Sequence, residues 1–231
     1  MAEKRYICSR KPMNTQDNTP HPQHDWLPEP TLRRLPWYLA YVTMLRHDGV
    51  EHVSSRGIAE AIGVDASQIA KDLSHLGVRG KTRIGYEVAA LERELRGFLG
   101  FNTGHNAVIT GVGSLGNALI QDRGLQRYGL NIVAGIDTNP DLVGTRAGGI
   151  VIMGYESLPG LVSEQDITIG IITVPAREAQ HAADRLTEAG IRAIWNFTPY
   201  RLRVRPGVVV TNTSIYSHLA VMYNRLESAS E

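Results

Sequence analysis

Residues 107–137 read AVITGVGSLGNALIQDRGLQRYGLNIVAGID, and this stretch decides the fold. It opens on an apolar run that is typical of a buried parallel strand. The run breaks at three glycines with the spacing G-x-G-x-x-G, namely Gly111, Gly113 and Gly116. A helical segment follows, and a second apolar run ends at Asp137. A strand, a glycine turn, a helix and a second strand in this order predict a Rossmann-type α/β unit.

Each glycine of this turn has a predicted role in holding a dinucleotide. Gly111 allows the tight turn, Gly113 lets the backbone approach a pyrophosphate, and Gly116 lets the helix pack close to the strand. The helix N-terminus offers N–H groups and a positive dipole end to the phosphates. Asp137, about 20 residues further on, can accept hydrogen bonds from both adenosine ribose hydroxyls and would repel a 2′-phosphate. The stretch predicts NAD(H) binding, but a unit without a nucleotide or one that holds coenzyme A stays open.

Length and composition limit the class of protein. The 231 residues suffice for one large domain or two small ones, and a net charge of +1 means that nucleic-acid binding needs a local basic patch. No apolar run approaches the ~20 residues that cross a bilayer, and the N-terminus has no apolar signal segment. The single cysteine, Cys8, excludes an internal disulfide and a cysteine-based zinc site. We therefore expect a cytoplasmic protein that does not bind membranes.

The first part of the chain carries a helix-turn-helix pattern. Residues 1–28 are polar and proline-rich and are predicted to be a disordered tail, followed by a DNA-binding domain over residues 29–100. This domain begins with a helix at residues 29–49. Next come a short helix that ends at Gly63 and a second one from residue 66 to about residue 76. Two short helices joined through a glycine turn are typical of this motif. An amphipathic helix at residues 91–99, with its glutamates and arginines in solvent, closes the domain.

The second short helix is the predicted recognition helix. Asp65 and Gln68 form a predicted capping box at its start, in which the acid accepts a backbone N–H and the glutamine reaches back. The side chains of Ser67, Gln68 and Lys71 should point outward. Glutamine can pair with adenine edges, and lysine with guanine or a phosphate.

A basic segment follows this helix. Arg79, Lys81 and Arg83 lie between glycines, which suits a short β-hairpin wing whose cations contact phosphates or a minor groove. A helix-turn-helix with such a wing predicts binding to DNA. A small helical oligomerisation domain with a solvated charged face would give the same pattern, and that alternative stays open.

Residues 101–212 alternate strands with helices, which predicts a parallel, doubly wound sheet with helices on both faces. Beyond Asp137, residues 138–159 are predicted to form a loop, a short strand and a turn. Strands are predicted at residues 164–173, 193–197 and 208–210, and a helix at residues 176–189. Ligands of such sheets bind at the carboxyl ends of the strands. The glycine turn, Asp137, residues 173–175 and residues 196–198 should therefore lie along one edge.

Residues 213–231 are predicted to form a final helix from about Ser214. Its apolar residues follow a helical spacing: Ile215, Leu219, Met222, Tyr223 and Leu226. A helix with such a stripe must pack on its own domain or on a partner subunit.

Both halves together resemble one family, the bacterial redox-sensing transcriptional repressors called Rex. The resemblance runs from about Thr31 to Leu226. It rests on the linked motifs TLRRLPWYL, SQIAKDLSHLG, RGKTRIGY, GVGSLGNAL, IVAGIDTNPDLVG, IITVPAREAQ and IWNFTP. It implies a winged-helix domain and a Rossmann domain, closed as a homodimer by exchange of the C-terminal helix. Members of the family bind palindromic operator DNA when NADH is low and release it when NADH binds between the Rossmann domains.

The resemblance also assigns site residues by position. The expected cofactor-binding residues are Gly111, Val112, Gly113, Ser114, Leu115, Gly116, Asp137, Thr173, Val174, Pro175 and Ile215. Of these, residues 173–175 would border the nicotinamide, and Ile215 would meet the nicotinamide pocket of the partner. The expected DNA-binding residues are Ser67, Gln68, Lys71, Arg79, Lys81 and Arg83. Neither a catalytic residue nor a metal ligand is expected.

Some positions depart from the family pattern. Ala70 stands where a basic residue usually precedes the Lys-Asp-Leu-Ser motif, and Asp122 aligns with a tyrosine of typical members. Ser214 lies in a segment that usually carries an acid. In the family, that tyrosine and acid form a network with an interdomain arginine, whose counterpart here is Arg34.

Two other functions compete with this interpretation. An NAD-dependent oxidoreductase would need an acid or base near residues 173–175, but TVPAREAQ and NFTPYR contain neither histidine nor lysine. His181 should be solvated or packed in the following helix, and His105 should lie at the opposite end of the sheet. A coenzyme A-binding regulator is the other alternative. Asp137 argues against it, because a carboxylate suits ribose hydroxyls better than a nearby 3′-phosphate.

Overall fold

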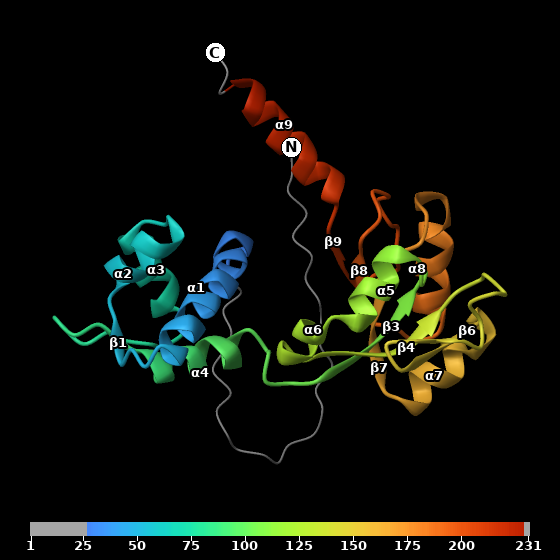
Figure 1. The fold of residues 1–231 in the computed structure, drawn as a ribbon, viewed down its shortest axis with the longest axis horizontal. Coiled ribbons are helices and arrows are strands. Elements are labelled where there is room, and N and C mark those ends of the chain that lie inside the picture. Colours follow the sequence, from blue (N-terminus) through green and yellow to red (C-terminus); the bar gives the residue numbers. More distant parts are fainter. Residues whose placement is uncertain (1–26, 229–231) are drawn as a thin grey trace. The chain divides into compact units, whose positions relative to one another are not determined.

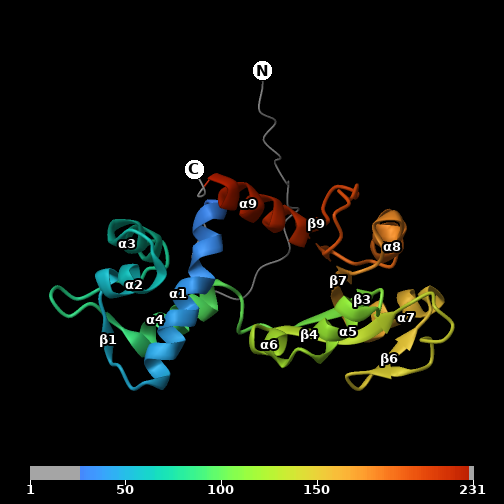
Figure 2. The same cartoon turned by 45° about the horizontal axis from the view of Figure 1, so that its top comes forward.

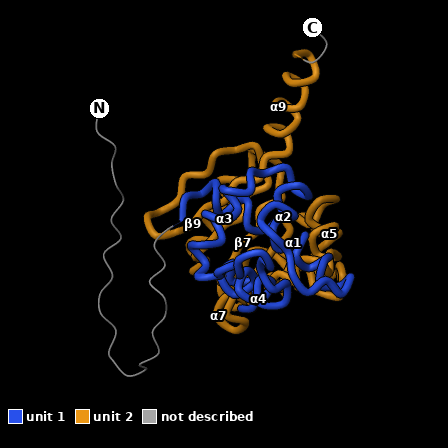
Figure 3. The backbone as a smooth tube through the Cα atoms, turned by 90° about the vertical axis from the view of Figure 1, so that its left-hand side faces the viewer, with its two compact units in different colours: residues 1–103 blue, residues 104–231 orange. Residues whose placement is uncertain are grey.

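The computed structural model describes residues 27–228, so most of the predicted disordered tail lies outside the described residues. The chain divides into two compact units, residues 1–103 and residues 104–231 (Figure 3). The sequence placed the boundary between its two domains at residue 100. No helix among the described residues is long and apolar enough to span a membrane.

The N-terminal unit is a small helical domain with a two-stranded sheet. Its elements are α1 (Glu29–His47), β1 (His52–Val53), α2 (Ser55–Ile62), α3 (Ala66–Ser74), β2 (Tyr86–Glu87) and α4 (Val88–Phe98). The strands β1 and β2 pair antiparallel. Helix α1 packs on α2 and α4, and α2 packs on α3 (Figure 2). The core draws fully buried side chains from each of these helices, such as Leu35, Ile58, Leu73 and Leu91.

Capping residues set where the two short helices, α2 and α3, begin and where α2 ends. The hydroxyl of Ser54 accepts the N–H of Gly57 at the start of α2, and Gly63 ends that helix in the left-handed region, with φ of 70°. Asp65 then accepts the N–H groups of Ser67 and Gln68 at the start of α3. The predicted capping box is half wrong. The Gln68 side chain does not reach back but donates from Nε2 to Asp72 Oδ1 at 2.8 Å, one turn further along α3.

Two other expectations for this unit need correction. The predicted wing is shorter than a regular hairpin, because the only bridge described within it joins Lys81 to Gly85, and β2 pairs with β1 instead. The glutamates of the last helix are not all solvated. Glu92 is 6% exposed and accepts hydrogen bonds from Arg46 and Thr43, which fastens α4 to α1.

The C-terminal unit is built on one sheet (Figure 1). Its strands are β3 (His105–Thr110), β4 (Leu130–Ile136), β5 (Arg146–Ala147), β6 (Ile150–Met153), β7 (Ile167–Ile172), β8 (Ala193–Asn196) and β9 (Val209–Asn212). Their order across the sheet is β5-β6-β4-β3-β7-β8-β9, and every neighbouring pair is parallel except β5 with β6. The chain starts at β3 in the middle and winds first to one side and then to the other, as predicted for a doubly wound sheet.

Helices cover both faces of this sheet. The helices of this unit are α5 (Ser114–Gln121), α6 (Arg123–Arg127), α7 (Leu158–Glu164), α8 (Ala179–Glu188) and α9 (Ile215–Ser228), with 3₁₀ turns at Tyr155–Ser157 and Ala176–Glu178. Helices α7 and α8 pack on one face, where Leu161 and Leu186 join the buried strand residues. Leu119 of α5 packs on the other face. The sequence pattern does not predict α7 and instead predicts a strand from residue 164, where this helix ends.

Candidate functional site: a glycine-turn pocket and an exposed helix-turn-helix

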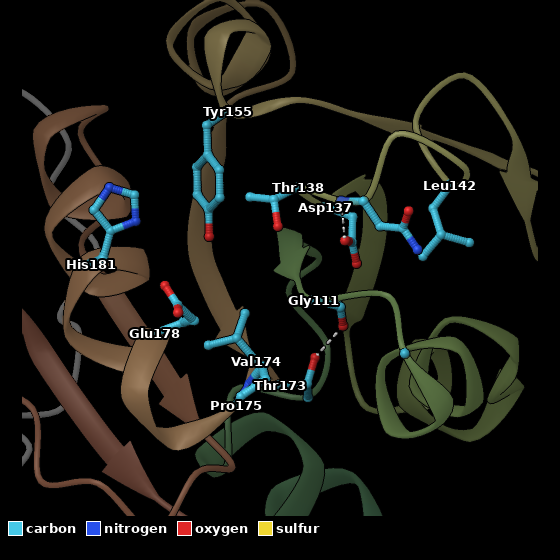
Figure 4. A pocket seen from close by; sticks show the side chains of 12 residues that line it. Gly111, Asp137, Thr138, Leu142, Tyr155, Thr173, Val174, Pro175, Glu178 and His181 are labelled. Carbon is cyan, nitrogen blue, oxygen red and sulfur yellow. Dashed lines mark hydrogen bonds between the residues drawn. The ribbon is translucent and has the colours of Figure 1, made fainter.

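A pocket opens at the carboxyl ends of β3, β4 and β7, where the chain changes its winding direction (Figure 4). It has a volume of about 500 Å³. Its lining residues are Gly111, Gly113, Asp137, Thr138, Asn139, Leu142, Tyr155, Thr173, Val174, Pro175, Glu178 and His181. In open α/β sheets, ligands bind at this switch point. The structure thus brings the predicted glycine turn, Asp137 and residues 173–175 into one cavity.

The three glycines of the turn differ in what surrounds them. Gly111 has φ of 86°, a region that L side chains rarely adopt, and a Cβ there would press on Val174. A Cβ on Gly116 would collide with the carbonyl oxygen of Gly111, so only glycine lets α5 lie this close to the turn. A Cβ on Gly113 would meet no described atom within 4 Å. The space beside Gly113 is therefore open, and Gly113 lines the pocket at the start of α5.

Asp137 supports the glycine turn from the end of β4. Its Oδ2 atom accepts the N–H of Val112 at 2.6 Å, and its Oδ1 atom accepts the N–H of Asn139 at 2.9 Å. A carboxylate has about four acceptor positions, so two remain for a ligand. On the neighbouring strand end, Thr173 Oγ1 donates to the carbonyl of Gly111 at 2.7 Å and ties the two loops together (Figure 4).

A second pocket adjoins the first one, because residues 173–175 line both. Its other lining residues are Leu115, Ala176, Phe197, Thr198, Pro199, Ile215 and Tyr216. This cavity is mainly apolar, and its lining residues 197–199 directly follow Asn196 at the end of β8. The amide of Asn196 is buried and bonds to the carbonyl of Tyr200 and to Thr198, which fixes the loop after β8.

Helix α3 presents two of its three predicted DNA-contacting side chains without restraint from other helices. Ser67 and Lys71 are exposed, and the hydroxyl of Ser67 bonds only within the first turn, to Asp65. Gln68 is half-buried against Asp72. The cations of the wing, Arg79, Lys81 and Arg83, are all exposed.

Asp72 lies inside this unit and joins α3 to α1. It is 1% exposed and accepts hydrogen bonds from Thr31, Arg34, Tyr38 and Gln68. Burial opposes its ionisation, but the hydrogen bonds from Arg34, Tyr38 and Gln68 keep the pKa of Asp72 below its usual value. Burial and the hydrogen bond to Asp72 raise the pKa of Tyr38 to about 12.

Helix α9 projects away from the sheet of its own unit (Figure 1). None of its described residues is buried. Several of its apolar side chains are about half exposed: Ile215, Val221, Met222 and Tyr223. An apolar patch of this kind on a terminal helix is typical of an interface.

Two family models match the chain. One is described as the N-terminus of a putative DNA-binding protein and matches residues 27–74, and the other as a CoA binding domain and matches residues 102–200. The redox-sensing transcriptional repressor Rex of Porphyromonas gingivalis is 56% identical over 202 residues, which cover 87% of this chain and 93% of the relative. The Rex protein of Bacteroides fragilis is 50% identical over 93% of this chain and 97% of its own length. The chain belongs to the Rex family.

Solved Rex-family structures share the fold. The crystal structure of RSP in complex with β-NAD⁺ and operator DNA is 35% identical, with a TM-score of 0.84 over 88% of this chain and 94% of that one. The structure of RSP in complex with β-NADH is 34% identical, with a TM-score of 0.79 over 89% and 96% of the two chains. The winged-helix and Rossmann architecture expected from the resemblance is therefore confirmed.

The structure adds pocket residues to the predicted set for this Rex-family protein. Tyr155, which follows β6, and Glu178 and His181, which follow β7, were not predicted to line the pocket (Figure 4). His181, which was expected to be solvated or packed, is exposed, and its ring stands edge-on to Tyr155 with 5.9 Å between the ring centroids. The spacing from the glycine turn to Asp137 predicts that the loop after β4 lines the pocket. No sequence motif predicts that the segment after β6 does so.

Arg34, the counterpart of the family's interdomain arginine, makes its described contacts inside the N-terminal unit. Its Nε and Nη2 atoms donate to Asp72 at 2.8 and 2.9 Å, and Nη2 also donates to Thr31, so its described partners lie in α1 and α3. Asp122, which aligns with the family tyrosine, caps α6 by accepting the N–H of Gly124. Each of these residues therefore has a local role within its own unit.

Proposed function

We propose that this Rex-family protein is a transcriptional repressor that binds operator DNA as a homodimer and releases it when NADH occupies the glycine-turn pocket. One observation carries the proposal: a single chain joins an exposed helix-turn-helix to a dinucleotide-type pocket. Relatives that are 50–56% identical over most of their length are named redox-sensing repressors. A soluble cytoplasmic location follows from this role.

In this proposal, NADH lies across the two adjoining pockets. The glycine turn, residues 111–116, receives the pyrophosphate at the start of α5, and Asp137 accepts the adenosine ribose hydroxyls. The second pocket, which Leu115 lines, takes the nicotinamide beside residues 173–175. After exchange of α9, Ile215 of the partner subunit would take the place that this chain's own Ile215 has in the lining. The open space at Gly113 supports this placement, because a phosphate fits where a side chain would have met nothing.

The mainly apolar second pocket favours the reduced cofactor. NAD⁺ carries a positive charge on the nicotinamide ring and NADH does not, and burying an unpaired charge is costly. If two arrangements of the dimer bind NADH unequally, the ligand shifts the population toward the one it prefers. Because two recognition helices must match the spacing of a palindrome, a rotation of the subunits ends DNA binding.

The DNA-binding surface is formed by α3 and the wing. Ser67, Gln68 and Lys71 enter the major groove, and Arg79, Lys81 and Arg83 contact the backbone. All of these residues except the half-buried Gln68 are exposed. Helix α9 completes the homodimer by exchange with the partner, which would cover the apolar side chains that it exposes here.

Calorimetric titration of the purified protein with NADH, NAD⁺, NADPH and coenzyme A tests the ligand assignment. We expect NADH to bind most tightly and NADPH to bind weakly, because Asp137 repels a 2′-phosphate. Asp137→Ala should lower NADH affinity by about ten-fold or more, since hydrogen bonds to a charged group contribute about 1.5–3 kcal/mol each. The exposed Asp141 is a matched control, and Asp141→Ala should leave the affinity unchanged. Tight binding of coenzyme A alone would contradict the NADH assignment and favour coenzyme A as the ligand, in line with the match to the CoA binding domain model.

A further inference from the structure

The carboxylate of Asp72 is fully engaged on both oxygens. Oδ1 accepts from Thr31 at 3.2 Å, Arg34 at 2.9 Å and Gln68 at 2.8 Å. Oδ2 accepts from Arg34 at 2.8 Å and Tyr38 at 2.7 Å. Three of these donors belong to α1, while Gln68 lies on α3 itself. Asp72 therefore holds the Gln68 side chain against a fixed framework supplied by α1.

The chemistry of the two groups fixes the orientation of the glutamine amide. An ionised carboxylate can only accept hydrogen bonds, so it can hold the amide nitrogen of Gln68 but not the amide oxygen. Turning the amide over would place oxygen against oxygen beside a buried negative charge. One hydrogen of Nε2 is used by Asp72, and the amide oxygen accepts no hydrogen bond within the described part of the chain. The outward edge of Gln68 is therefore one acceptor beside one donor.

This edge matches one base in the major groove. Adenine offers the N6 donor beside the N7 acceptor, whereas guanine offers two acceptors, O6 and N7. A glutamine that can turn its amide can also present its NH₂ group to guanine O6 or thymine O4. A glutamine held in one orientation keeps the acceptor in place and pairs with adenine.

We propose that Asp72 is a positioning residue that locks the Gln68 amide so that Gln68 selects adenine in each half of the operator. The proposal rests on the proposed function, in which α3 enters the major groove. Gln68 is the residue that touches the base. Asp72 acts through it, from a position that DNA cannot reach.

Selection from a randomised double-stranded DNA library, with the full-length protein, tests this proposal. The wild type should select a palindrome with an adenine preference at one position of each half-site, and Gln68→Ala should lose the preference at that position alone. In Asp72→Asn the partner can also donate a hydrogen bond, so the Gln68 amide can turn. We expect the preference for adenine over guanine there to fall by about ten-fold, within the range of a bidentate base contact. Tyr38→Phe, which removes another donor to Asp72, should leave the base preference unchanged.

A second variant keeps the test decisive if Asp72→Asn does not fold. Gln68→Glu retains Asp72 and its pair with Arg34 but replaces the amide nitrogen with oxygen. Repulsion from Asp72 should turn the new carboxylate outward, where it can only accept hydrogen bonds. Its preference should move from adenine to cytosine, whose N4 group donates. The proposal is overturned if Asp72→Asn keeps the wild-type profile, if Gln68→Glu keeps adenine, or if Gln68→Ala changes no position. A wild-type protein that enriches no sequence would instead contradict the proposed DNA-binding function itself.

Discussion

Asp72 accepts hydrogen bonds from four side chains of the N-terminal unit. It is a buried carboxylate that connects α1 to α3, and its partner Arg34 has only 22% of its side chain exposed. The sequence could not reveal this, because the two residues lie 38 positions apart and each has an ordinary alternative in solvent. Glu92 was assigned to solvent for the same reason. The roles of Gly111 and Gly116 were predictable because the atoms that exclude a side chain lie within the local motif or at the end of the neighbouring strand.

Asp72→Ala should destabilise the N-terminal unit by about 3 kcal/mol, because it leaves Arg34 without its buried partner. Tyr38→Phe, which removes one hydrogen bond to Asp72, should cost about 1 kcal/mol. Urea unfolding of the full chain, followed by hydrogen exchange at amides of α1 and α3, measures both values. Equal effects of the two substitutions would contradict the dominant role of the ion pair.

The same pair predicts how stability depends on pH. The pKa of Asp72 is lower in the folded than in the unfolded chain, so its stabilisation is present above the unfolded value of about 3.9 and is lost as the pH falls through the folded value. The stability difference between wild type and Asp72→Ala should be constant near neutral pH and shrink below about pH 4. A difference that persists unchanged into acid would show that the carboxylate charge is not what stabilises this unit.

At the scale of elements, the glycine turn and α5 are the part of the pocket that the sequence predicted best. The glycine turn, the helix and the strand that follows them lie in one continuous stretch of sequence and belong to one motif. Helix α7 was missed because it is only seven residues long and has a proline in its first turn, which resembles a turn signal. The segment after β6 reaches the pocket only because β6 pairs with β4, and no local pattern encodes that pairing.

A substitution at Gly113 in the glycine turn should affect NADH binding without affecting folding. Gly113 has φ of −73°, and a Cβ there would meet no described atom, so Gly113→Ala should change stability by no more than about 0.5 kcal/mol. The methyl group would occupy the space that we assign to the pyrophosphate, and NADH affinity should fall at least about ten-fold, or 1.4 kcal/mol. Thermal unfolding and calorimetry measure the two effects.

Gly116→Ala is the counterpart of this variant. Its Cβ would collide with the carbonyl of Gly111, so this substitution should destabilise the C-terminal unit by about 1–3 kcal/mol through overpacking. If Gly113→Ala binds NADH as tightly as the wild type, the pyrophosphate does not lie at this turn.

At the scale of the whole molecule, the homodimer that we propose depends on α9. Its apolar side chains were visible in the sequence, but whether they pack on their own domain or on a partner was not. In the described structure none of them is buried. Met222→Glu should give monomers in sedimentation experiments, because it places a charge in the proposed interface. Asn224→Glu adds the same charge at a polar position of the same helix and should leave the dimer intact, and a dimeric Met222→Glu protein would contradict the exchange of α9.

We propose that NADH occupancy of the pocket controls DNA binding, and anisotropy titration of a labelled duplex measures this control. The duplex is the one selected from the random library, titrated with full-length protein alone, with NAD⁺ or with saturating NADH. We predict that NADH weakens DNA binding by at least about ten-fold, a typical coupling between two sites, while NAD⁺ does not. The same DNA affinity in all three conditions would contradict the account.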